Sequence, residues 1–208
     1  IRHRESFEVE GQRHSFTAPK FRYVFPQRKR VILVLDISQA MNDNKRRWER
    51  TRNALFRFFA HVQEGTEVGI VTFGAQARTN TEPTIITDAN REGVFGRIPF
   101  RLLDDARGCI ECALRQAFDL LTVAGANGDE TNGGSIVLVT GTETVDEPLD
   151  ELVEEMESRA VPVFNVAFDR LSKNAVRMAK YGGNYVVPPH RADLLQNLSD
   201  ILIAILKT

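Results

Sequence analysis

The most informative segment of the chain is Arg30-Val-Ile-Leu-Val-Leu-Asp-Ile-Ser-Gln-Ala-Met41. Its five residues from Val31 to Leu35 are all apolar, which is typical of a strand buried on both faces of a parallel sheet. The run ends at Asp36 and Ser38, whose side chains carry oxygen atoms. Because open α/β sheets bind ligands at the carboxyl edge of their strands, this loop is the first candidate for a functional site.

Segments with strand-like and helix-like patterns alternate along the rest of the chain. Further strands are predicted at Val68–Phe73, Thr84–Thr87, Ser135–Thr140, Val161–Ala167 and Asn184–Val187, and helices over about 45–63, 89–95, 110–121, 149–156, 172–181 and 194–205. We expect Gly65 to end the first helix as its C-cap. The alternation predicts an α/β fold, doubly wound, with a mostly parallel sheet and helices on both faces. Strand 31–35 should be central, between 68–73 and 135–140, with 84–87 antiparallel at an edge.

The first 27 residues differ in pattern from the rest. They combine mixed charge and two prolines with weak periodicity, so we interpret 1–27 as a linker or edge segment with a short strand around Phe21–Phe25. Residues 28–208 are then one domain, which we interpret as part of a longer protein.

Composition excludes some classes of partner. The 208 residues are 42% hydrophobic and 26% charged, with a net charge of −1. A net charge near zero gives no general electrostatic attraction to nucleic acid. The apolar runs of the sequence are also too short to span a bilayer. We therefore predict no nucleic-acid partner and no direct membrane insertion.

The opening segment resembles the first strand and the Asp-x-Ser-x-Ser loop of von Willebrand factor type A domains. The resemblance implies a divalent cation held by oxygen atoms from three loops. Asp36 and Ser38 match this pattern, but Ala40 replaces the second serine, the threonine position falls on or beside Gly108, and the second aspartate position is Gly141. Mg²⁺ prefers about six oxygen ligands, so the remaining carboxylate and hydroxyl make a poor site.

We therefore expect no cofactor, with Asp36 and Ser38 capping backbone donors at the turn instead. Mg²⁺ or Ca²⁺ would bind only if Asp104, Asp105 or Glu143 supplied a substitute oxygen. Conversely, Ala40→Ser, Gly108→Thr and Gly141→Asp together are expected to create a metal site. The residues expected in the partner-binding loops are Asp36, Ser38, Ala40, Asp104, Asp105, Gly108, Gly141 and Glu143.

A narrower resemblance rests on three segments: Phe25-Pro-Gln-Arg-Lys29, Val68-Gly-Ile-Val-Thr-Phe73 and Cys109-Ile-x-x-Ala-Leu-Arg-x-Ala-Phe118. Over about 25–206 they look like the type A domain of the calcium-activated chloride channel regulator family. The resemblance implies a secreted or cell-surface protein in which this domain is a non-enzymatic module. Its protein partner would be a membrane channel or a matrix protein.

Two other functional hypotheses remain open. The domain could be structural and brace an upstream hydrolase domain, in which case a large apolar patch should lie away from the loops. An enzyme acting through Asp36 and Glu143 is the third hypothesis, although no nucleophile–base pair accompanies them. No His-Glu-x-x-His protease motif occurs in the chain.

Cys109 and Cys112 form a Cys-x-x-Cys motif at the start of a predicted helix. A zinc site needs about four ligands and the four histidines are scattered. A redox pair at a helix N-terminus and a local disulfide in an extracellular protein are further alternatives. We expect two buried thiols, packed beside Ile110 and Ala113.

Basic residues gather at 28–30, 45–47, Arg50 and Arg52. They could form a partner-binding patch, but we favour the exposed face of an amphipathic helix. Asn197-Leu-Ser199 is a glycosylation sequon inside a helical pattern, so we expect it to be unused.

Overall fold

A six-stranded sheet forms the centre of the computed structural model, which describes residues 4–9, 12–17, 29–42, 46–104, 108–121, 134–141, 149–168, 177–187 and 194–206. The strands are β3 (Arg30–Asp36), β4 (Glu67–Phe73), β5 (Ala77–Ile85), β6 (Gly134–Thr140), β7 (Val163–Phe168) and β8 (Gly183–Val187). Their order is β5-β4-β3-β6-β7-β8, and only β5 runs antiparallel to its neighbour. The predicted central position of the first strand, between β4 and β6, is confirmed.

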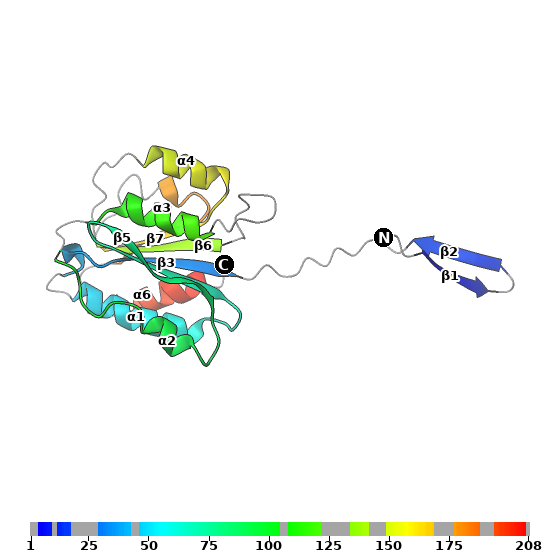
Figure 1. Ribbon diagram of the computed structural model, residues 1–208, viewed down its shortest axis with the longest axis horizontal. Coiled ribbons are helices and arrows are strands. Elements are labelled where there is room, and N and C mark those ends of the chain that lie inside the picture. The colour runs from blue at the N-terminus through cyan, green and yellow to red at the C-terminus, as the bar shows by residue number, and fades with distance from the viewer. Residues whose placement is uncertain are drawn as a thin grey trace.

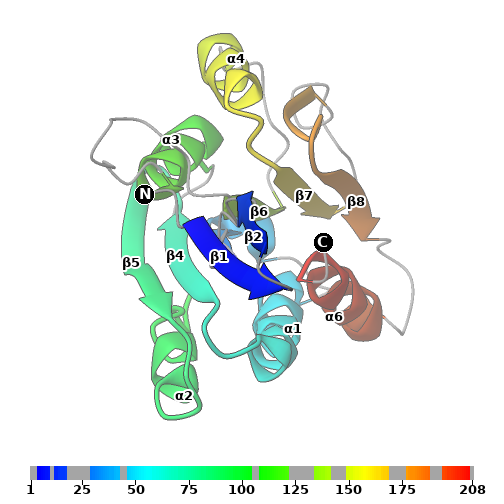
Figure 2. The same ribbon diagram turned by 90° about the vertical axis from the view of Figure 1, so that its right-hand side faces the viewer.

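Helices cover both faces of this sheet (Figures 1 and 2). They are α1 (Arg47–His61), α2 (Arg91–Phe95), α3 (Ile110–Leu121), α4 (Asp150–Ser158) and α6 (Leu194–Ile205), with a 3₁₀ turn, η1, at Gln39–Met41. α3 and α4 lie on one face, and α1, α2 and α6 on the other. The predicted doubly wound α/β fold is therefore confirmed.

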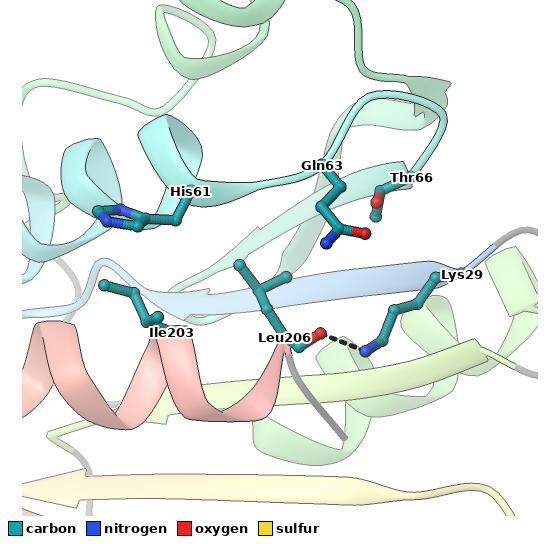
Figure 3. Close-up of a pocket in the computed structure, with 6 residues that line it drawn as sticks. All are labelled: Lys29, His61, Gln63, Thr66, Ile203 and Leu206. Carbon is teal, nitrogen blue, oxygen red and sulfur yellow. Dashed lines mark hydrogen bonds between the residues drawn. The ribbon is translucent and has the colours of Figure 1, made fainter.

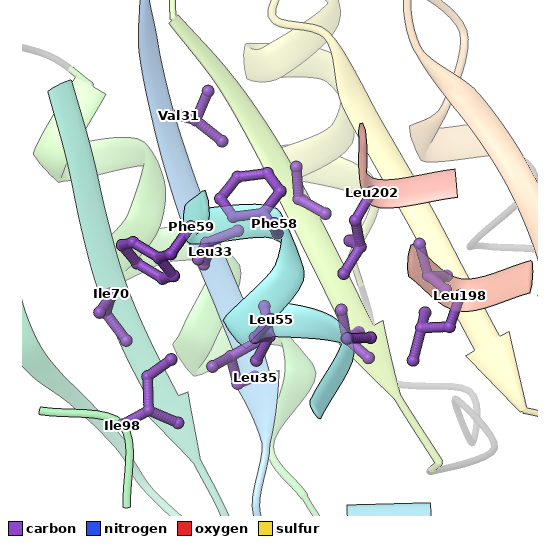
Figure 4. Close-up of a cluster of buried hydrophobic side chains, with 14 of the residues drawn as sticks. Val31, Leu33, Leu35, Leu55, Phe58, Phe59, Ile70, Ile98, Leu198 and Leu202 are labelled. Atoms are coloured by element: carbon purple, nitrogen blue, oxygen red, sulfur yellow. The ribbon is translucent and has the colours of Figure 1, made fainter. Parts of the chain in front are cut away.

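The central strand explains why two cores form. Successive side chains of a strand point to opposite faces. Val31, Leu33 and Leu35 accordingly pack against α1 and α6 (Figure 4), and Ile32 and Val34 pack against α3 and α4. All five are fully buried, which is why the apolar run has no polar interruption.

Two predicted details are wrong. The edge strand was expected at Thr84–Thr87, but β5 begins at Ala77, because its half-exposed, polar residues show no apolar run. The first helix has Val62 rather than Gly65 as its C-cap. Arg91 donates to the carbonyl oxygens of Phe59 and Val62 at 2.5 and 2.6 Å, which satisfies the helix end. Gly65, at φ +86°, lies in the following turn.

Residues predicted as a linker contain a β-hairpin. β1 (Arg4–Val9) and β2 (Gln12–Thr17) pair antiparallel in a sheet of their own. Apolar and polar residues alternate only weakly in these two strands, so the sequence pattern did not predict them. The predicted strand at Phe21–Phe25 lies outside the described residues, as does the first half of the predicted helix over 172–181.

The helices α4 and α1, which lie on opposite faces of the sheet, differ in charge. α4 contains Asp150, Glu151, Glu154, Glu155 and Glu157 and no basic residue, whereas α1 contains four arginines and a single glutamate. The acidic helix α4 therefore lies across the sheet from the basic helix α1 (Figure 1). Within the described ranges, no helix is long and apolar enough to span a membrane.

A hollow of about 250 Å³ lies at the opposite end of β3 from Asp36 (Figure 3). The Lys29 ammonium donates a hydrogen bond to the carbonyl oxygen of Leu206 beside it. This bond ties the start of the central strand to the end of α6.

Candidate functional site

Asp36, the last residue of β3, is completely buried at the carboxyl edge of the sheet. Its Oδ1 accepts hydrogen bonds from the backbone N–H and the hydroxyl of Ser38, at 2.9 and 2.6 Å. Its Oδ2 accepts from the Thr140 hydroxyl at 3.0 Å and from the Gly141 N–H at 3.1 Å. A buried carboxylate is costly unless its oxygens are satisfied, and these four donors supply that compensation.

Ser38 is the N-cap of the 3₁₀ turn that follows β3. Its hydroxyl oxygen accepts a hydrogen bond from the N–H of Ala40 at 3.3 Å. The predicted capping role of Asp36 and Ser38 at this turn is confirmed. The Asp36 carboxylate therefore holds both the backbone and the side chain of Ser38 at the start of this turn, before α1 begins.

Thr140 is a residue of this site that sequence analysis missed. It ends β6, the strand beside β3, and is also buried. A polar residue at the end of an apolar strand was the available signal, because neighbouring parallel strands end at the same edge.

Gly141 leaves no room for a side chain. A Cβ atom there would lie 2.7 Å from the carbonyl oxygen of Ala40 and 2.8 Å from the sulfur of Met41. The nearer atom belongs to the backbone and cannot rotate away. An aspartate at position 141 would first have to displace the backbone of residue 40, so the expectation that Gly141→Asp helps to create a metal site stays a prediction that requires this loop to move.

Arg47 lies against the same loop. It donates a hydrogen bond to the Ala40 carbonyl at 3.3 Å, and its guanidinium carbon is 5.6 Å from the centroid of the Phe168 ring. We expected a solvated arginine here, but Arg47 is half-buried and supports the turn.

Asp104 is connected to the loop through Gln39 rather than through Asp36. The Gln39 amide donates to the Leu103 carbonyl at 3.1 Å and to Asp104 Oδ1 at 3.3 Å. The Leu103 N–H donates to the Ile37 carbonyl at 2.8 Å. Loops 37–42 and 101–104 therefore form one connected surface. Asp105 and Glu143 lie outside the described residues.

An open hollow of about 440 Å³ lies beside this surface. It is lined by Gln39, Met41, Asn42, Arg46, Trp48, Glu49, Arg101 and Leu102. Its lining combines both signs of charge, amides and one tryptophan. Such a mixture suits contact with a protein surface.

Cys109 and Cys112 form a disulfide at the start of α3, with their Cα atoms 5.4 Å apart. The prediction of two buried thiols is wrong, because Cys112 is exposed and Cys109 only half-buried. Residues three apart lie on the same side of a helical turn, within disulfide reach. The N–H of Cys109 donates to the Gly74 carbonyl at 2.7 Å, and the preceding Gly108 is buried.

Searches among known proteins identify the family. The profile of the von Willebrand factor type A domain matches residues 31–143, more than half of the chain. The chain belongs to the von Willebrand factor type A domain family. Domains of this family are generally non-catalytic modules for protein–protein interaction.

Individual relatives agree with this assignment. The chain is 28% identical over 153 residues to calcium-activated chloride channel regulator 1 of Bos taurus, covering 73% of this chain and 16% of the relative. It therefore spans about one sixth of that protein. Proximal thread matrix protein 1 from the mussel byssus shares the fold, with a TM-score of 0.65, 13% identity and coverage of 86% and 46% of the two chains. A type A domain from Catenulispora acidiphila has a TM-score of 0.66 at 15% identity, covering 86% and 43%.

Among the described residues, no group of three or more histidine, cysteine, aspartate or glutamate side chains could hold a metal ion. Asp36 and Ser38 are both engaged in the hydrogen bonds given above.

Proposed function

We propose that this type A domain binds a protein partner through its carboxyl-edge loops without a bound metal. The observation that supports this proposal is that the two oxygens of the Asp36 carboxylate accept four hydrogen bonds from the described part of the protein itself. A cation would have to replace these donors and then complete its coordination shell. Gly141 has no room for a carboxylate, so the residues present do not fit Mg²⁺ or Ca²⁺ well.

The partner surface that we propose is the joined surface of loops 37–42 and 101–104 with the adjacent hollow. Asp104 is an exposed and Gln39 a half-buried polar residue on it, and Trp48 is a buried aromatic in its wall. The role is non-enzymatic, because Asp36 is fully buried and each of its oxygens is already an acceptor.

The parent protein is proposed to be secreted or at the cell surface, with a membrane channel or a matrix protein as partner. Similarity to a chloride channel regulator supports this location. The Cys109–Cys112 disulfide supports it independently, because disulfides persist in oxidising compartments.

Calorimetric titration with MgCl₂ and CaCl₂ tests the metal-free site. We expect no saturable heat up to about 1 mM, a range in which extracellular calcium modules bind. Asp36→Ala is the matched control and should give the same flat titration. A one-to-one isotherm that Asp36→Ala abolishes would contradict the proposal.

Capture of cell-surface and matrix proteins on the immobilised domain tests partner binding. We expect a captured protein whose yield is the same with and without EDTA and falls at least tenfold in Gln39→Arg or Asp104→Arg. Lys180→Glu, at an exposed lysine that pairs with Glu157 of α4, is the control and should not change the yield. Capture that needs a divalent cation, or that ignores both loop variants, would contradict this site.

A further inference from the structure

A cluster of aromatic rings surrounds Arg52 on the surface formed by α1 and α2. The guanidinium carbon of Arg52 lies 4.5 Å from the ring centroid of Phe100 and 5.8 Å from that of Phe95. Phe56, one helical turn further along α1, meets Phe95 edge-on with the centroids 5.5 Å apart. We call these four residues the arginine–aromatic cluster. Phe56 and Phe100 have 57% and 76% of their surface exposed, which is unusual for phenylalanine.

Arg52 has no counter-ion within the part of the chain that the structure describes. Its Nε–H is buried and lacks an acceptor. The neighbouring Arg91 differs, because it donates to the carbonyls that end α1 and pairs with Asp88 at 3.1 Å. Arg91 is thus used within the fold, while the contacts of the Arg52 guanidinium among the described residues are with the rings of Phe95 and Phe100. A guanidinium oriented in this way is prepared to pair with a carboxylate.

The charge around the cluster has one dominant sign. Over 47–61 and 91–104 there are seven arginines against three carboxylates, although the whole chain has a net charge of −1. The arginines are Arg47, Arg50, Arg52, Arg57, Arg91, Arg97 and Arg101. An acidic ligand is therefore attracted to this face, and a basic one is repelled.

An apolar hollow adjoins the cluster. It has a volume of about 150 Å³ and is lined by Phe56, Phe59, Ala60, Arg91, Glu92 and Phe95. Interfaces commonly anchor an aromatic or aliphatic side chain in a small pocket of this kind. The hollow therefore adds an apolar contact next to the unpaired cation.

We propose that the arginine–aromatic cluster binds an acidic peptide segment that also carries an aromatic side chain, supplied by a protein partner. A carboxylate of the segment pairs with Arg52, and the aromatic side chain enters the hollow beside Phe56. The unpaired cation distinguishes this surface from the apolar patch expected of a domain that only braces a neighbour. The proposal does not depend on the metal-free site at Asp36.

Fluorescence anisotropy with a labelled synthetic peptide, Asp-Phe-Glu-Phe-Asp-Glu, tests the proposal. We expect saturable one-to-one binding with a Kd of about 10–100 μM, weakened about tenfold or more by Arg52→Gln. Arg52→Lys keeps the charge but loses the planar guanidinium and should recover only part of the affinity. Phe100→Ser, at a largely exposed position, should weaken binding without affecting the core.

Matched controls separate this mechanism from general charge attraction. Arg115→Gln removes an exposed arginine from α3, on the opposite face, and should leave the Kd unchanged. The peptide with Asn and Gln in place of Asp and Glu should bind at least tenfold more weakly. The proposal is overturned by no saturable binding up to about 1 mM, by equal losses in Arg52→Gln and Arg115→Gln, or by equal binding of the neutral peptide. Binding of phosphatidylserine vesicles instead of the peptide, lost in Arg52→Gln, would also overturn it.

Discussion

At the scale of single residues, Asp36 shows how one side chain can have a structural role at a position that family resemblance associates with a metal. Among the described residues, four donors to its oxygens come from the loop that follows β3 and from the end of β6. The carboxylate therefore connects two strand ends that are 104 residues apart in sequence.

Asp36→Asn is expected to destabilise the domain by about 2–3 kcal/mol, because the new amide group would point its N–H donors at other donors. Urea unfolding measures this loss, and it should be the same with and without Mg²⁺. Asp104→Asn, at an exposed position, should change stability by less than about 0.5 kcal/mol. A loss that depends on Mg²⁺ would identify Asp36 as a metal ligand instead.

Two glycines provide a second comparison at this scale. Gly141→Ala should cost about 1–3 kcal/mol, because its Cβ meets the backbone of residue 40. Gly93→Ala, in α2 with nothing within 4 Å of its Cβ, should stabilise the domain by about 0.5–1 kcal/mol. Thermal unfolding of both variants checks the signs. A neutral Gly141→Ala would mean that the loop moves easily.

Whether a residue of this site could be predicted depends on its position in the sequence relative to the apolar strands. Asp36 and Ser38 follow an apolar run directly, so their place at the sheet edge could be predicted. Thr140 could have been identified in the same way, because it ends an apolar strand. Arg47 could not, because its contact with the loop depends on how α1 is placed in space.

At the scale of elements, the buried strands were predictable, and so was the half-exposed strand β8, but the start of the edge strand β5 was not. β3, β4, β6 and β7 are apolar on both faces, so each appears in the sequence as a continuous run. β5 is a half-exposed edge strand, and its start at Ala77 left no such pattern. From the sequence, the disulfide at the start of α3 was one of several alternatives, which included two buried thiols. The exposure of Cys112 decides between these alternatives, and it depends on how the helix is oriented.

The Cys109–Cys112 disulfide should contribute modestly to stability. It closes a very short loop, for which the chain-entropy estimate is at most about 2 kcal/mol. Replacing both cysteines by alanine should lower the melting temperature by a few degrees, and reductant should lower that of the unmodified domain equally. Cooperative melting followed by circular dichroism checks both. A reductant effect that persists in the alanine pair would show that the disulfide is not its cause.

At the scale of the whole molecule, the hairpin and the six-stranded sheet are separate units of pairing. A fragment that begins at Arg28 should therefore melt within about 1 °C of the full chain, because it keeps the core intact. Differential scanning calorimetry measures the difference. A fragment that begins at Leu33 is the control and should not fold, because it lacks the first half of β3. A large loss in the first fragment would place the hairpin in the domain.

The opposite charges of α1 and α4 act on a charged partner before it touches the domain. Within about 8 Å, the Debye length at physiological ionic strength, a negatively charged partner attracts the basic helix α1 and repels the acidic helix α4, which turns the α1 side of the domain toward the partner. Productive collisions should therefore begin already oriented, and their rate should fall steeply as salt is added. The dissociation rate, which is set by short-range contacts, should change far less.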